Sequence, residues 1–199
     1  MVEGWDHDPP AKEKAVPLGI LALVTGALTL VFGSGGSSDF WADALQLWWS
    51  GVREAWPKVR RLVLYLDNGP ENSGRRTQFL KRMVQFADWS GLEVRLVYYP
   101  PYHSKYNPVE RCWSALERKW NGVLLNSWDV ILACARRMTW RGMHPAVERL
   151  PGEYPKGVRV SAKDMKPYRA RLERSAALPQ YDITIKPLVP RGRESFSAP

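Results

Sequence analysis

A short apolar run that ends in a carboxylate constrains the fold of this chain more than any other feature. Residues 62–66 are all apolar or aromatic, and Asp67 follows them directly. A run of this length without polar alternation is typical of a strand that is buried on both faces in a mainly parallel sheet. Open α/β sheets bind their ligands beyond the carboxyl ends of such strands. We therefore predict that Asp67 lies at a ligand-binding edge of a sheet.

The apolar periodicity along the rest of the chain predicts alternating strands and helices. Strands are expected at 16–24, 27–32, 61–66 and 92–98, and helices at 39–54, from 72 or 73 to 89, at 107–120 and from 127 onward. Serines before the first helix and Gly91 after the second are expected to bound these helices. The order of the elements predicts an α/β layer protein with crossover connections.

The apolar stretch 16–32 has a second interpretation, as a membrane anchor. It is shorter than the roughly 20 residues that a membrane-spanning helix needs, and Pro17 and Gly19 interrupt it. Two strands joined by a tight turn at Thr25 and Gly26 fit the pattern better. We therefore expect a hairpin, no membrane association and a cytoplasmic location.

The charge of the chain points to a polyanionic partner. The net charge is +9 and the isoelectric point about 9.7, which favours nucleic acid ahead of a membrane surface. A basic surface without such a partner is the alternative. Cys112 and Cys134 are far apart and lack a metal-ligand or redox spacing, so we expect buried, reduced thiols.

Positive charge is concentrated near the C-terminus. Residues 152–199 carry ten Lys and Arg against five Asp and Glu. We predict a core domain of residues 1–150 and a basic, partly disordered C-terminal extension of residues 151–199. Within the extension the sequence predicts a helix at 161–172, an edge strand at 181–185 and disorder after Pro187.

Glu110 is the second acidic residue in an informative position. Asn107 and Pro108 precede it with the residue types that open a helix, and the rigid pair Pro100 and Pro101 leads the chain back from the preceding strand. This path brings Glu110 toward Asp67, and two such carboxylates suit Mg²⁺ or Mn²⁺. Structural interpretations remain open, with Glu110 in a capping box and Asp67 in a turn.

Two motifs in this region resemble a known family. They are Leu-Asp-Asn-Gly-Pro-Glu-Asn at 66–72 and Pro-Pro-Tyr-His-Ser-Lys-Tyr-Asn-Pro-Val-Glu-Arg-Cys-Trp at 100–113. The chain resembles DDE-type insertion-sequence transposases of the ISAzo-type group, in the branch related to the Tc/mariner elements, over roughly residues 12–187. The resemblance implies a ribonuclease-H-like mixed sheet flanked by helices, in which two Asp and one Glu hold two divalent metals. Asp67 would be the second acidic ligand and Glu110 the third.

The first acidic ligand of the family has no clear counterpart. In the family it lies on a strand before the hairpin, whereas Asp6 and Asp8 lie in a polar segment with Pro9 and Pro10. We therefore expect the C-terminal portion of a transposase catalytic domain without its first strand, inactive in DNA cleavage and strand transfer until an upstream transposase polypeptide completes it. The alternative is a non-enzymatic remnant that binds DNA or a transposase.

The resemblance implies binding to element ends and target DNA, with a homo-oligomer on DNA as a possible assembly. Basic side chains near the two motifs and in the extension are candidates for phosphate contacts, with simple surface solvation as the alternative for each. The candidates are Arg75, Arg76, Arg82, His103, Lys105, Arg111, Arg169 and Arg171.

Overall fold

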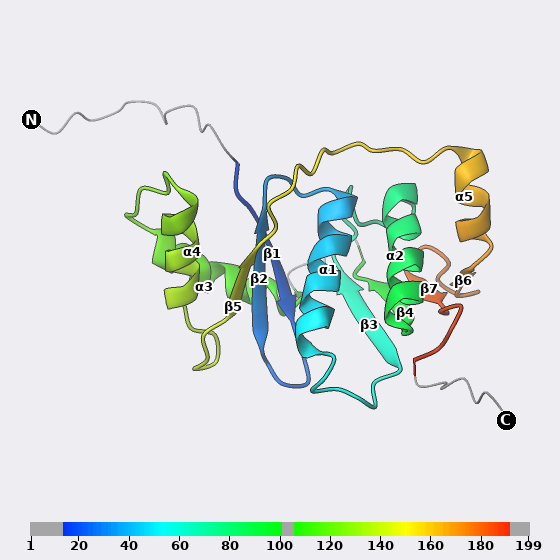
Figure 1. The fold of residues 1–199 in the computed structure, drawn as a ribbon, viewed down its shortest axis with the longest axis horizontal. Coiled ribbons are helices and arrows are strands. Elements are labelled where there is room, and N and C mark those ends of the chain that lie inside the picture. Colours follow the sequence, from blue (N-terminus) through cyan, green and yellow to red (C-terminus); the bar gives the residue numbers. More distant parts are fainter. Residues whose placement is uncertain (1–13, 101–105, 192–199) are drawn as a thin grey trace, which may run out of the picture.

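The computed structural model describes residues 14–100 and 106–191 (Figure 1). Its elements are β1 (Val16–Leu21), β2 (Leu28–Gly33), α1 (Ser38–Val52), β3 (Arg61–Leu66), α2 (Thr77–Ser90), β4 (Glu93–Tyr98), α3 (Glu110–Trp120), α4 (Trp128–Arg137), β5 (Ala146–Arg149), α5 (Ala162–Arg169), β6 (Leu172–Arg174) and β7 (Asp182–Ile185). The predicted alternation of strands and helices is confirmed. The sequence interpretation did not include β5 and β6.

The described strands form two mixed sheets. One has the order β1-β2-β5, with β1 antiparallel and β5 parallel to β2. The other has the order β3-β4-β7-β6, with β3 and β4 parallel and the remaining pairs antiparallel. Helices α1 and α2 lie beside each other (Figure 1), with α1 against β1 and β2 and α2 against β4 and β7. The arrangement is consistent with the predicted ribonuclease-H-like class.

The apolar stretch near the N-terminus forms the predicted hairpin. Strands β1 and β2 pair in register from Val16 opposite Gly33 to Leu21 opposite Leu28. The turn closes with Ala22 N–H donating to the Ala27 carbonyl at 2.9 Å, and Gly26 supplies a positive φ of 74°, which glycine adopts without strain. Among the described residues, no helix is long and apolar enough to span a bilayer.

Two helices begin later than the sequence predicts. Helix α2 starts at Thr77 rather than at residue 72 or 73, because the Asn72 side chain donates to Asp67 instead of capping a helix. Helix α3 starts at Glu110, and the backbone N–H of Glu110 donates to the Asn107 carbonyl at 3.0 Å within the preceding turn. Glu110 is therefore the first helical residue rather than the third. Gly91, with φ 69°, ends α2 as predicted.

The C-terminal segment belongs to the second sheet. Strand β7 pairs with β4 on one side and β6 on the other, so the prediction of an edge strand was wrong. Ile183 and Ile185 are fully buried in the main core. Residues 188–191 are also placed, since Arg191 N–H donates to the Gly91 carbonyl at 2.7 Å and its guanidinium lies over the Trp49 ring. The prediction of disorder after Pro187 was therefore wrong for residues 188–191. Residues 192–199 lie outside the part of the chain that the structure describes.

Apolar side chains pack into two main clusters. One joins α1 and α2 to β3, β4 and β7, and the other joins β2 and β5 to α3 and α4. Cys112 and Cys134 are buried free thiols in α3 and α4, as predicted, and burial raises the pKa of Cys112 to about 11. The second cluster packs α3, which begins at Glu110, against the first sheet.

Strand β3 is less buried than its sequence predicts. From Arg61 to Tyr65 its side chains alternate between exposed and half-buried, with Val63 38% and Tyr65 47% exposed, and Leu66 is buried. The expectation of burial on both faces was therefore wrong. One face of β3, with Leu62, Leu64 and Leu66, packs on the main core, and the alternate residues Val63 and Tyr65 belong to the opposite face.

Candidate functional site

Asp67 follows β3 at the edge where the parallel strands β3 and β4 both end. Leu66 is in register with Tyr98, the last residue of β4. One carboxylate oxygen, Oδ1, accepts a hydrogen bond from Asn72 Nδ2 at 2.7 Å and another from Gly69 N at 3.4 Å. Asn68 adopts a left-handed φ of 62°, which Asn tolerates better than most residues. The turn role of Asp67 is thus present, and its carboxylate remains exposed.

Side-chain oxygen atoms of Asp67 and Asn72 lie close to Gly69 in this turn. Asn72 Oδ1 is buried and has no hydrogen-bond partner among the described residues. A Cβ added to Gly69 would lie 3.3 Å from Asn72 Oδ1 and 3.6 Å from both carboxylate oxygens of Asp67. Because buried acceptors are almost always paired, an unpaired amide oxygen beside a carboxylate fits a bound cation. Glycine at position 69 leaves the space for one.

Tyr98, the last residue of β4, lies near Asp67 at this edge of the sheet. Its Oη is also buried without a partner in the described part of the chain. Burial raises the pKa of Tyr98, the nearby charge of Asp67 raises it further, and Arg174 opposes the shift. Tyr98 therefore stays a neutral hydroxyl group that can donate a hydrogen bond at this edge of the sheet.

Glu110 lies within electrostatic reach of Asp67. Although its side chain reaches solvent, desolvation by its surroundings raises the pKa of Glu110, and the negative charge of Asp67 raises it further. A carboxylate that is partly desolvated near a second negative charge favours a bound proton or a cation. Glu110 is in this situation.

Gly19 in β1 sets the position of the helix that carries Glu110. A Cβ at Gly19 would lie 2.8 Å from Val109 Cγ2 and 3.1 Å from the Trp113 ring. Only a residue without a side chain allows the start of α3 to approach β1 this closely. In the sequence Gly19 stands out only as an interruption of an apolar run, because a close approach to a residue 90 positions later leaves no local signal.

The donor set partly fits the divalent metal that the family implies. Asp67 and Glu110 supply hard carboxylate oxygens, and Asn72 Oδ1 supplies a neutral one, all of which Mg²⁺ accepts. Within the described residues, no group of three or more His, Cys, Asp and Glu side chains is arranged to hold a metal. Asp6 and Asp8 fall outside the described part of the chain.

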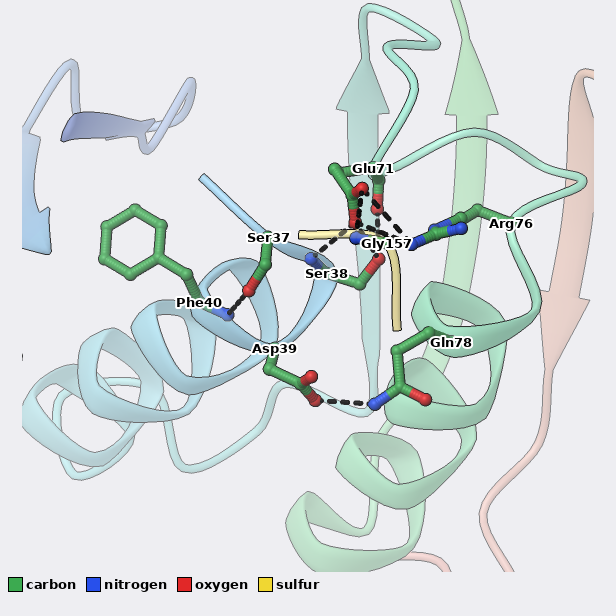
Figure 2. A network of polar contacts seen from close by, with 8 residues as sticks. All are labelled: Ser37, Ser38, Asp39, Phe40, Glu71, Arg76, Gln78 and Gly157. Carbon is green, nitrogen blue, oxygen red and sulfur yellow. Dashed lines mark hydrogen bonds and ion pairs between the residues drawn. The ribbon is translucent and has the colours of Figure 1, made fainter. Parts of the chain in front are cut away.

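Glu71 connects the turn that follows Asp67 to the start of α1 through hydrogen bonds with Ser38 (Figure 2). Its Oε2 accepts from Ser38 N at 3.2 Å and from Ser38 Oγ at 3.0 Å, and it pairs with Arg76 at 3.1 Å. The backbone N–H of Gly157 donates to Oε1 at 3.3 Å. Burial opposes ionisation, but these hydrogen bonds and the Arg76 charge together lower the pKa of Glu71. Glu71 is therefore a fixed anion at the N-terminus of α1, where the helix dipole favours negative charge.

Three of the predicted DNA-contacting arginines have carboxylate partners inside the protein. Arg76 pairs with Glu71, and Arg82 pairs with both Asp39 and Asp43. Arg171 makes two hydrogen bonds to Asp88, at 2.6 and 2.8 Å. All three side chains are largely shielded from solvent. The partners of Arg82 and Arg171 come from other helices, so the sequence did not reveal those pairs, whereas Glu71 lies five residues before Arg76 in the same loop.

The other predicted basic residues are placed differently. Arg75, Arg111 and Arg169 are exposed, although Arg75 also donates to Gln180 Oε1. His103 and Lys105 lie outside the described residues. The exposed arginines flank the Asp67 turn, the start of α3 and the end of α5.

Comparison with known proteins agrees with the motif analysis. A family model described as the Rhodopirellula transposase DDE domain matches residues 1–187. Neither the curated proteins nor the solved structures give a significant match. Because the match extends over nearly the whole chain, this protein belongs to that family of transposase DDE domains.

Proposed function

We propose that the protein contributes the second and third metal-binding carboxylates to a site for DNA strand cleavage and transfer in transposition. Asp67 and Glu110 would be those ligands. The observation that supports this assignment best is that Asp67 directly follows β3 and Glu110 begins α3, with the charge of Asp67 contributing to the raised pKa of Glu110. Family membership supports the reaction class.

The protein side of the mechanism follows from the local contacts. Asn72 donates to one oxygen of Asp67 and so orients the carboxylate, with its own Oδ1 as a further ligand. Glu110 must lose its proton to bind a cation, and its raised pKa makes this loss dependent on pH. When bound, Mg²⁺ or Mn²⁺ stabilises charge on the attacking and leaving oxygens of the phosphodiester.

For DNA binding we propose the exposed arginines Arg75, Arg111 and Arg169, together with His103 and Lys105. The net charge of +9 supports a polyanionic partner. The proposal gives a smaller role to Arg76, Arg82 and Arg171. If one of these side chains turned to a DNA phosphate, its carboxylate partner inside the protein would become unpaired. Element ends and target DNA would be the substrates, with a homo-oligomer on DNA as the assembly.

A second candidate function is DNA binding without catalysis. The observation that favours it is the number of carboxylates, since the described residues hold no cluster of three metal-ligating side chains. Two-metal phosphodiester chemistry depends on precise positioning of the ions. A site short of one carboxylate would bind DNA and not cut it.

A nicking assay separates the two functions. The substrate is a duplex from the ends of the element that encodes the chain. The protein is supplied alone and with the polypeptide encoded upstream of it. We expect little or no nicking by the chain alone and Mg²⁺-dependent nicking by the combination. Asp67→Asn and Glu110→Gln should abolish nicking.

The matched control is Glu117→Gln, an exposed carboxylate two turns further along α3. It should leave nicking unchanged. Binding of the duplex without nicking by either preparation would favour the non-catalytic function.

A further inference from the structure

An exposed aromatic ring precedes Asp67 on the same strand. Tyr65 lies two residues before Asp67, a spacing at which the side chains of a strand share a face. Its ring is 47% exposed, although most of the ring is apolar. Two residues of a strand span about 7 Å. The Tyr65 ring therefore lies in the immediate neighbourhood of the proposed metal-binding carboxylate.

Tyr99 places a second ring beside the first. The backbone N–H of Tyr99 donates to the Leu66 carbonyl at 2.9 Å, which holds this residue next to the end of β3. Its side chain is half-buried, whereas that of the preceding residue, Tyr98, is buried. The ring centroids of Tyr65 and Tyr99 are 6.2 Å apart, and the ring planes are inclined by 39°. Aromatic rings attract each other at this distance, so the two rings hold each other in place.

The two rings do not belong to the packed core. Leu62 and Leu64 of β3 pack against the main cluster, while Tyr65 and Tyr99 are absent from the three core clusters of the described residues. Helix α2 packs on β4 and β7 from the core side of the sheet. Alternate side chains of β4 and β7, on the other face, are only half-buried. This face is therefore open to a ligand.

The remainder of the open face is polar but nearly balanced in charge. Arg61 pairs with Glu93, and Arg95 pairs with Asp182, each at 2.6 Å. The two pairs line a trough of about 260 Å³. Because both arginines have carboxylate partners, the face has little net field to attract a phosphate. A ligand is therefore held here by contact with the rings and not by its charge.

We propose that Tyr65 and Tyr99 form a stacking platform for an unpaired base of a DNA strand. Every base has a flat π-face, and proteins that bind single strands stack bases on exposed aromatic rings. A base inside a duplex has both faces covered by its neighbours, so the platform selects unpaired nucleotides. The location of that base rests on the proposed function, because Asp67 would place it beside the phosphodiester that is cut.

The test compares two DNA probes that have the same charge. Each is a labelled duplex with a short single-stranded tail. One tail has bases, including a fluorescent adenine analogue, and the other has the same sugar-phosphate backbone without bases. We expect the full chain to bind the tail with bases about tenfold more tightly and to quench the analogue, because stacking lowers its emission. The buffer contains EDTA, so the result does not depend on metal binding.

Substitutions of Tyr65 separate stacking from a structural role. Tyr65→Ala should weaken binding of the tail with bases about tenfold and leave binding of the tail without bases unchanged. The slope of log affinity against log salt should also stay the same, because no phosphate contact is lost. Tyr65→Phe keeps the ring and should bind and quench like the parent chain. Tyr99→Ala repeats the test at the second ring.

Trp89 provides the matched control. It is 44% exposed, and its ring contacts Phe86 at a centroid distance of 5.8 Å. It lies in the last turn of α2, away from the open face. Trp89→Ala should leave binding of both tails unchanged, with circular dichroism confirming that the variants are folded. Equal binding of the two tails by the parent chain, no quenching, or equal losses in Tyr65→Ala and Trp89→Ala would overturn the proposal.

Two further results assign the face and the metal site separately. A homodimer that dissociates in Tyr65→Ala would assign the open face to a second copy of the chain and overturn the platform. Quenching by a chain whose Mn²⁺ affinity is unchanged in Asp67→Asn would reject the proposed metal site and leave the platform in place.

Discussion

The negative charge of Asp67 contributes to the raised pKa of Glu110, although the two residues are 43 positions apart in the chain. Asp67 follows β3 and Glu110 begins α3. Helix α2 and strand β4 lie between them in the chain, and the start of α3 approaches β1 closely at Gly19. A cation between the carboxylates would remove the repulsion, so metal binding and the protonation of Glu110 are linked.

The linkage predicts the pH dependence of metal binding. The pKa of Glu110 in the folded protein is raised above 4.5, its value in the unfolded chain. At a pH between these two pKa values, the folded protein keeps the Glu110 proton that the unfolded chain has lost. Stability without metal therefore falls over that interval, while Mn²⁺ affinity increases. Asp67→Asn should shift the pKa of Glu110 downward, as measured by ¹³C NMR titration of the Glu110 carboxyl. An unchanged pKa in this variant would show that the two groups do not interact.

Glu71 should have the opposite effect on stability. Its pKa is lowered below 4.5, so its stabilising contribution is present above pH 4.5 and is lost as pH falls through its folded pKa. Glu71→Gln should cost about 1–3 kcal/mol at neutral pH, because Arg76 and Ser38 lose a charged partner. Urea unfolding measures the change. Glu153→Gln, at an exposed position, should cost little, and an equal loss in both variants would argue against the network.

The space around Gly19 can be tested with a pair of glycine substitutions. Gly19→Ala places a methyl group 2.8 Å from Val109 Cγ2 and should destabilise the protein by about 1–3 kcal/mol, while displacing α3 and weakening Mn²⁺ binding. In Gly51→Ala no atom lies within 4 Å of the added Cβ. This control lies in α1 and should stabilise the protein by about 0.5–1 kcal/mol. A Gly19→Ala protein as stable as the parent chain would contradict the close approach of α3 to β1.

Arginines with and without internal partners should differ in DNA binding. Arg111→Ala should reduce the slope of log affinity against log salt by about 0.9 for each phosphate that the side chain no longer neutralises. Arg82→Ala should leave that slope nearly unchanged and lower the thermal stability, because Asp39 and Asp43 would then have no cationic partner at this position. Fluorescence anisotropy across a salt series and thermal melts measure the two effects. A reversed pattern would assign the DNA surface to α2.

The sequence predicted what local patterns determine. The bounds of β3, the hairpin and the end of α2 at Gly91 all follow from apolar periodicity and from residues with special backbone preferences. The predicted order of strands and helices also placed Asp67 at the end of a strand and Glu110 near the start of a helix. These features depend on neighbours within a few positions.

The sequence did not reveal contacts between distant segments. Strand β7 lies inside the sheet because β6 folds against it, and the short β6 has no apolar pattern. Glu71 accepts hydrogen bonds from Ser38 at the start of α1, 33 residues earlier in the chain, while Ser37 is the cap of that helix. Because β6 and β7 complete the sheet, removing residues 152–199 would disrupt the core as well as the charge, so single arginine variants are the better test of DNA binding.

Mn²⁺ binding measured by electron paramagnetic resonance tests the central claim most directly. A shared metal site predicts that Asp67→Asn and Glu110→Gln each lower the affinity at least about tenfold, while Glu117→Gln on the same helix leaves it unchanged. Equal Mn²⁺ affinity in the parent chain, Asp67→Asn and Glu110→Gln would contradict a metal site between these two residues.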